Sequence, residues 1–217
     1  MSTFLMKARI YKNVILGTNC EIEDYCEIGK PSGDKKKGKL QTIIGNNAII
    51  RSGTVIYCGV KIGNNFQTGH HVLIREGNKI GSNVSIGTNS TVEVDNIIGD
   101  NVRIHSLCFL EKVKLGKNVF VGPHVAFFDD PHPSIPRGRN CIRGAVVKES
   151  AKIGGGSRIL PFVTIGKNSL VGAGSVVIKN VPDNTVVVGN PAKKLKKIGD
   201  IICKRKGARH YPYDSLG

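Results

Sequence analysis

The segment 127–137 carries the residues of this sequence that are best suited to proton transfer. It reads FFDDPHPSIPR, so that His132 stands between two prolines and follows the pair Asp129 and Asp130. Prolines stiffen the backbone, and stiff surface loops present polar groups at functional sites. Because an imidazole titrates near neutral pH, we predict that His132 is a catalytic base and that Asp130 orients it or the group that loses the proton. We expect Asp129 and Arg137 of the same loop to bind a substrate.

Around this loop the sequence repeats every six residues. Between 147 and 181 an aliphatic residue recurs at every sixth position, and four residues later comes a smaller one; the aliphatic positions are Val147, Ile153, Ile159, Ile165, Val171 and Val177. A short strand with a corner has this period, and three such units close one triangular turn of about eighteen residues. The repeat therefore predicts a parallel β-helix with aliphatic residues inside and left-handed backbone angles at corners such as Gly166-Lys167-Asn168.

The same period gives the extent of the β-helix. It holds from Leu16 to Ile28 and from Ile44 to Leu110, loses one residue, and continues from Leu115 to Phe127 before the final stretch, which makes about eight coils. We expect residues 1–182 to form the β-helix, with loops at 30–43 and 128–146. Residues 183–217 leave the repeat, and their composition favours a short helical or extended cap followed by a basic tail.

Residues eighteen positions apart stack in such a helix, so one edge of the prism collects the residues that follow the column of Thr68 and Val121. This edge holds His70, His71, His105 and His124, four of the six histidines. We expect the loop with His132 to leave the same edge. His70 and His71 are further substrate-binding candidates and reserve candidates for the base, with His105 and His124 after them.

Two small residues extend this edge if the chain re-enters the prism on the same face after the loop. The column then continues at Ile153 and Val171, which places Gly155 and Ala173 on the histidine edge. Their backbone N–H groups would stand about 4.8 Å apart, with no bulky side chain in front. Such a row is a natural groove for a molecule with an amide-containing arm.

The stretch IGKNSLVGAGSVVIKNVPDNTVVVGNPAKKL, residues 165–195, resembles the closing section of the hexapeptide-repeat acyltransferases. The resemblance covers nearly the whole chain and implies a left-handed parallel β-helix, although the general rule for crossovers favours the right hand. It further implies a homotrimer whose loops reach across to a neighbouring subunit. Acetyl-CoA is the implied acyl donor, with its pantetheine arm at Gly155 and Ala173 and its phosphates near Lys179, Lys193 and Lys196.

Two branches of that family suggest different acceptors, and the loop shares features with both. Sugar-nucleotide N-acetyltransferases, which the chain resembles most, carry Asn-Asp where this chain has Asp129-Asp130. Galactoside and maltose O-acetyltransferases carry His-Pro where it has His132-Pro133, and that histidine is their base. We expect N-acetylation of a nucleotide-linked amino sugar for a surface polysaccharide or glycan. The alternatives are O-acetylation of a sugar hydroxyl, or a scaffold or carbonic anhydrase with zinc on His70, His71 and His105.

Composition narrows the class of partner. The net charge is +16, from 32 Lys and Arg against 16 Asp and Glu, but aromatic residues make up only 6% and Trp is absent. A stacking platform for nucleic acid is therefore poorly supported, and the charge fits phosphorylated substrates better.

With no apolar run of eighteen residues and no leader, we expect a soluble, cytoplasmic protein. Cys20, Cys26 and Cys108 occupy small corner positions, no CxxC pair exists, and we expect no metal.

Overall fold

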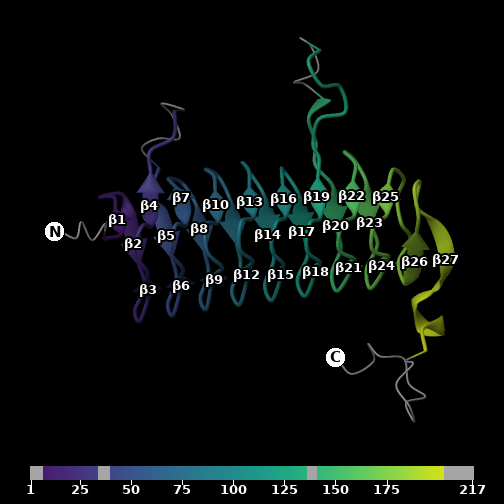
Figure 1. Cartoon of the computed structure of the whole chain (residues 1–217), viewed down its shortest axis with the longest axis horizontal. Coiled ribbons are helices and arrows are strands. Elements are labelled where there is room, and N and C mark those ends of the chain that lie inside the picture. The colour runs from purple at the N-terminus through teal and green to yellow at the C-terminus, as the bar shows by residue number, and fades with distance from the viewer. Residues whose placement is uncertain (1–6, 34–39, 136–140, 203–217) are drawn as a thin grey trace, which may run out of the picture.

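The computed structural model describes residues 7–33, 40–135 and 141–202, and within them the chain winds into a triangular prism of three parallel sheets (Figure 1). The coils form a left-handed parallel β-helix, as the resemblance implied. Sheet A consists of β1 (Arg9–Ile10), β4 (Glu27–Lys30), β7 (Val55–Tyr57), β10 (Leu73–Ile74), β13 (Thr91–Val92), β16 (Phe109–Leu110), β19 (Ala126–Phe127), β22 (Arg158–Ile159) and β25 (Val176–Val177).

The other two sheets complete the prism. Sheet B consists of β2 (Val14–Leu16), β5 (Thr42–Ile44), β8 (Lys61–Ile62), β11 (Lys79–Ile80), β14 (Ile97–Ile98), β17 (Lys114–Leu115), β20 (Val146–Val147) and β23 (Thr164–Ile165). Sheet C consists of β3 (Glu21–Ile22), β6 (Ile49–Ile50), β9 (Gln67–Thr68), β12 (Ser85–Ile86), β15 (Arg103–Ile104), β18 (Phe120–Val121), β21 (Lys152–Ile153), β24 (Leu170–Val171), β26 (Thr185–Val188) and β27 (Lys193–Lys197). The predicted number of about eight coils is confirmed.

The six-residue period has the physical basis that the sequence indicated. The second residue of a typical strand points inward, and Ile153, Ile159 and Val171 are each 0% exposed. The smaller residues four positions later, such as Ser157 and Ser175, are also 0% exposed and fill the corners. Asn168 has a φ of 55° at its corner, a left-handed conformation that asparagine tolerates better than most residues.

The predicted column of stacked residues is confirmed, including its continuation after the long loop. Ile104 pairs with Val121, Val121 with Ile153, and Ile153 with Val171 in sheet C. The chain therefore returns from residues 128–145 to the same face order. From β3 to β24, each strand of sheet C is followed by a corner that leads to sheet A, and we call this row of corners the C–A edge. The corners from sheet A to sheet B form the A–B edge, and those from sheet B to sheet C form the B–C edge.

The loop that carries His132 leaves a different edge from the one we predicted. It connects β19 of sheet A to β20 of sheet B, so it leaves the A–B edge and not the C–A edge with the other histidines. The excursion between β4 and β5 leaves the A–B edge as well, and both project from the same side of the prism (Figure 1). The reason is that Phe127 lies six residues after Val121 and therefore belongs to the next face.

The C-terminal end of the prism differs in part from the prediction. The repeat does not stop at Pro182, because β26 adds another parallel strand beside β24, with Val171 opposite Val187. The expected cap follows, with β27 antiparallel to β26 and then a short 3-10 helix, η3 (Ile198–Asp200). No helix in residues 7–33, 40–135 and 141–202 is long and apolar enough to cross a membrane.

Candidate functional site

Gly155 and Ala173 lie on successive coils of the C–A edge, as predicted. The Gly174 N–H donates to the Gly155 carbonyl at 2.9 Å, and the Gly156 N–H donates to the Pro123 carbonyl at 2.8 Å, so a backbone ladder runs along this edge. The N–H groups of Gly155 and Ala173 themselves donate to no atom of the described chain. Two amide donors are therefore free to bind a ligand that lies along the edge.

Close packing of successive corners explains why glycine precedes each of these positions. A Cβ on Gly154 would lie 2.5 Å from the backbone nitrogen of Ala173, and a Cβ on Gly122 would lie 2.6 Å from that of Gly155. At these two positions a side chain would force the successive corners apart. The sequence signal for the amide row is thus the glycine before each small residue.

Among the histidines of the C–A edge, His124 lies nearest in the ladder to the amide row. It follows Pro123, whose carbonyl is bonded to Gly156 in the next coil, and its own carbonyl accepts from Arg158 Nη1 at 2.7 Å. Four coils separate His70 from Gly155 along the edge, roughly 19 Å at the usual ladder spacing. Stacking thus brings His124, our lower-ranked candidate, closer to the amides than His70 or His71.

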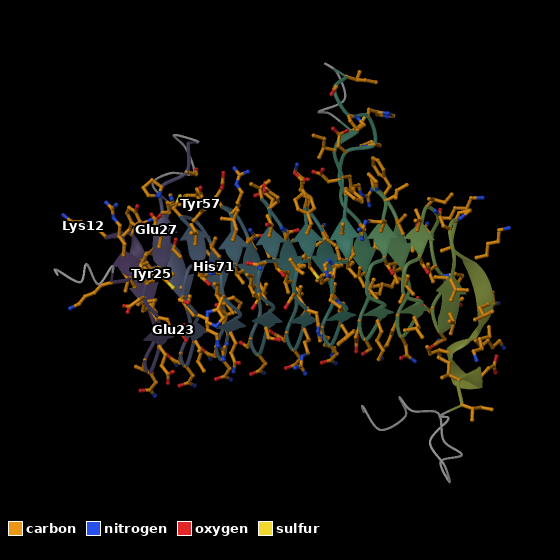
Figure 2. All side chains as sticks on the ribbon, viewed as in Figure 1. Lys12, Glu23, Tyr25, Glu27, Tyr57 and His71 are labelled. Atoms are coloured by element: carbon orange, nitrogen blue, oxygen red, sulfur yellow. The ribbon has the colours of Figure 1, made fainter. Side chains whose placement is uncertain are left out.

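His70 belongs to a separate polar group nearer the N-terminus, in the region where Figure 2 labels Glu23 and His71. The His70 Nδ1 lies 2.9 Å from Ser52 Oγ and 3.9 Å from Glu23 Oε2. The Glu23 carboxylate also accepts from the Ser52 N–H at 2.9 Å. Because both partners face the same ring nitrogen, this group lacks the relay geometry in which a base and its orienting carboxylate use opposite nitrogens.

His105 occupies the middle of the edge. Its ring centroid lies 5.0 Å from that of Phe120, with an interplanar angle of 60°.

No three His, Cys, Asp or Glu side chains in the described residues gather closely enough to hold a metal ion within one chain. No disulfide joins the described cysteines Cys20, Cys26, Cys58, Cys108 and Cys141.

The loop side chains are placed as follows. His132 is exposed, and its backbone N–H donates to Asp130 Oδ1 at 2.8 Å, so the Asp130 carboxylate closes an Asx turn with the His132 backbone. This turn fixes the backbone of His132 and not its ring. Arg137 lies outside the described residues. A sheet's width separates the loop from the amide row, so one chain does not bring His132 to Gly155.

Asp129, which we expected to bind a substrate, is engaged at the base of the loop. It is 4% exposed, and its Oδ2 accepts from Lys112 Nζ at 2.9 Å. Its carbonyl accepts from the Arg143 N–H at 2.8 Å, which ties together the two ends of the loop. The side chain therefore anchors the loop to the A–B edge.

Glu111 is a titrating group that the sequence did not reveal. Burial, together with the charge and a hydrogen bond of Asp129 and the charge of Glu93, raises its pKa to about 7, while Lys112 acts in the opposite direction. The proximity depends on how the loop folds back, so no local motif signals it. Glu76 lies on the A–B edge, as Glu111 does, and its Oε1 pairs with Arg75 Nη2 at 3.1 Å.

The three predicted phosphate-binding lysines do not converge. Lys179 follows β25 on the A–B edge, away from the amide row. Lys193 is exposed on β27 opposite Val188, whose side chain packs over Gly172, so it lies at the end of the row. Lys196 Nζ donates to the Asp200 carbonyl at 3.3 Å.

Comparisons with known proteins agree with the repeat. Residues 144–179, which include both free amides, match the family model described as bacterial transferase hexapeptide (six repeats). A galactoside O-acetyltransferase of Lactococcus lactis is 40% identical over 90 residues, which cover 40% of this chain and 44% of that protein. The chain spans about half the length, or less, of the curated relatives it matches, at 51% and 44% for two of them.

Solved structures share the fold at low identity. The UDP-N-acetylglucosamine acyltransferase from Campylobacter jejuni superposes with a TM-score of 0.71 at 20% identity, covering 88% of this chain and 73% of that one. The Arabidopsis UDP-N-acetylglucosamine acyltransferase gives a TM-score of 0.51 at 19% identity, with the same coverage of 88% and 73%. Residues 144–179 therefore carry a hexapeptide repeat of the bacterial transferase type, and the chain is folded as a left-handed parallel β-helix.

Proposed function

We propose that this protein is an acyltransferase that moves an acetyl group from acetyl-CoA to the amino group of a nucleotide-linked amino sugar. The observation that carries the proposal is the row of free backbone amides at Gly155 and Ala173, within the segment that matches the transferase repeat. The pantetheine arm of coenzyme A contains two amide groups, and such a row can bind them without side chains. Lys193, at the end of the row, is placed to meet the phosphates.

The chemistry requires three things from the site. The acceptor nitrogen attacks the thioester carbonyl, the tetrahedral oxyanion needs hydrogen-bond donors, and the nitrogen loses a proton as the thiolate of coenzyme A leaves. The exposed imidazole of His132 can take that proton. His70 and His71 lie far enough from the amides to contact a distant part of a long acceptor.

Completion of the site requires a second subunit. His132 and the amide row lie on different edges of one prism, so we propose a homotrimer in which the loop of one subunit faces the C–A edge of the next. This arrangement also turns the shallow wall of a prism into a pocket. We place the reaction in the cytoplasm, in the synthesis of a surface polysaccharide or glycan, with no metal required.

A second candidate is O-acetylation of a sugar hydroxyl. The match to a galactoside O-acetyltransferase and the His132-Pro133 pair favour it. A hydroxyl needs a base throughout the reaction, whereas an amine can bind in its neutral form. Rates with a matched amino sugar and hydroxy sugar therefore separate the two candidates, and replacement of His132 should abolish O-transfer at every pH.

The first test is thermal stability with acetyl-CoA, because a ligand that binds only the folded state raises the melting temperature. Ala173→Leu should raise the KM for acetyl-CoA at least tenfold, since the exposed side chain would cover the free amide. Lys117→Leu, at the equivalent corner position of the B–C edge, is the matched control and should leave KM unchanged. A wild-type protein that does not respond to millimolar acetyl-CoA would refute the proposal.

A further inference from the structure

A groove of about 760 Å³ crosses the outer face of sheet C, a volume within the usual range for small-ligand sites. Its floor comes from the outward residues of four successive strands, Arg103, Phe120, Lys152 and Leu170. These residues are partners in register, so they follow one another in steps of about 4.8 Å. A cation, an aromatic ring, a second cation and an aliphatic side chain therefore form one line along the prism.

The groove favours an anion. None of the described residues that line it is acidic. Lys152 is half-buried, and burial lowers the pKa of its ammonium group, whose Nζ donates to the Ser150 carbonyl at 3.0 Å. A partly desolvated cation gains more from a bound anion than an exposed one does. Arg103 supplies a second cation, with a planar guanidinium suited to phosphate.

One rim of the groove presents open amide groups, because the asparagine ladder of the B–C edge is interrupted there. Asn101 Nδ2 donates to Asn118 Oδ1 at 3.1 Å, and Asn168 Nδ2 donates to Asn184 Oδ1 at 3.1 Å. The position between these pairs is Ser150, which is too short to bridge them. The Asn118 amide nitrogen and the Asn168 carbonyl oxygen thus have no side-chain partner in the described chain, and both residues line the groove.

The other rim leads to the proposed chemistry. Gly154 lines the groove and directly precedes Gly155 of the amide row. The Phe120 ring, on the floor, also contacts His105 of the C–A edge. A ligand held in the groove can therefore extend onto the edge where acyl transfer is proposed.

We propose that this groove binds the nucleoside diphosphate moiety of a substrate. The base lies against Phe120, with its polar edge toward the open amides of Asn118 and Asn168, and the cations on either side of the ring, Arg103 and Lys152, neutralise the phosphates. An aromatic ring stacks on any base without preference. The free donor of Asn118 and the free acceptor of Asn168, by contrast, match a base whose edge offers one acceptor and one donor. The inference rests on the proposed function, because both the acyl donor and a nucleotide-linked acceptor contain this moiety.

Calorimetric titration with ADP, the nucleoside diphosphate within coenzyme A, and with UDP identifies which substrate occupies the groove. Tighter binding of ADP assigns it to the donor, and tighter binding of UDP assigns it to the acceptor. Arg103→Gln, Lys152→Gln and Phe120→Ala should each weaken the bound nucleotide about tenfold, and the double variant Arg103→Gln/Lys152→Gln about a hundredfold. Lys114→Gln removes a lysine that faces outward from sheet B and should change affinity less than twofold.

Two results would overturn the inference. One is wild-type protein that binds neither nucleotide; the other is a double variant that binds as tightly as Lys114→Gln. The test is separable from that of the proposed function, which is stabilisation of the wild type by acetyl-CoA. If acetyl-CoA stabilises the wild type and the double variant equally and neither nucleotide binds, the groove assignment fails while acyl transfer stands. Melting curves by circular dichroism confirm that each variant is folded.

Discussion

The neighbours of Glu111 predict how the stability of this protein depends on pH. The folded chain raises the pKa of this carboxyl from 4.5 to about 7, so between these values the folded state keeps a proton that the unfolded chain has released. Folding stability must therefore fall as the pH rises through this window and stay lower above it. Glu111→Gln removes the titration and keeps a donor toward Asp129. The variant should equal the wild type at pH 4.5 and be more stable at pH 8.

The size of the gain follows from the two pKa values of Glu111. A difference of one pKa unit corresponds to about 1.4 kcal/mol, so the full difference would amount to about 3 kcal/mol. Because Glu111 is only half-buried, solvent screening reduces this to about 1–2 kcal/mol. In melting temperature the gain at pH 8 is roughly 2–8 °C for a chain of this length.

Chemical denaturation at pH 4.5, 6 and 8, followed by circular dichroism, measures the effect. Glu149→Gln is the control, since Glu149 is a half-buried glutamate that pairs only loosely with Lys117 and Lys167, at 3.7 and 3.8 Å. It should show no gain at pH 8. A difference between Glu111→Gln and wild type that is the same at pH 4.5 and pH 8 would refute the reasoning.

Three further predictions concern the prism. Phe127→Ala empties a fully buried position and should cost about 3–5 kcal/mol in the free energy of unfolding, measured by urea denaturation. Gly154→Ala should cost about 1–3 kcal/mol, because its Cβ would lie 2.5 Å from the Ala173 nitrogen. Gly174→Ala, with a φ of 71° and nothing within 4 Å, should cost only the backbone strain of about 1–2 kcal/mol; equal losses for the two glycines would contradict the packing argument. Ser150→Asn, at a φ of 59°, should complete the asparagine ladder and gain about 0.5–1.5 kcal/mol in thermal or urea unfolding, and a loss would mean that the ladder contributes nothing there.

Much of the fold could be predicted because the repeat contains its own register. The spacing of Ile153 from Val171 was enough to stack Gly155 and Ala173, whereas their place on the histidine edge depended on the chain returning to the same face after the loop. Handedness could not be obtained this way and came from the resemblance. The additional strand at Thr185–Val188 was missed because the chain is two residues shorter between Val177 and Val181, so Val171 and Val187 pair across sixteen positions and not eighteen.

The site was predicted less completely, for two reasons. The edge from which the His132 loop leaves was contained in the repeat, since Phe127 lies one face beyond Val121, and it was assigned wrongly. The burial of Asp129 and its contacts with Lys112 and Glu111 could not be predicted, because they depend on where an irregular loop folds back. The six-residue period locates the corners of the β-helix, but it carries no information about the conformation of the loops that interrupt it.

Both excursions leave the A–B edge, and the sheets continue across them as if they were absent. Leu115 pairs with Val147 in the same register as any neighbouring pair, although more than thirty residues separate them. The β-helix and its loops are thus structurally independent. A loop of another length or composition could be inserted at the A–B edge without changing the register of the strands. Under the proposed function, a change of loop would alter the acceptor preference and leave the amide row in place.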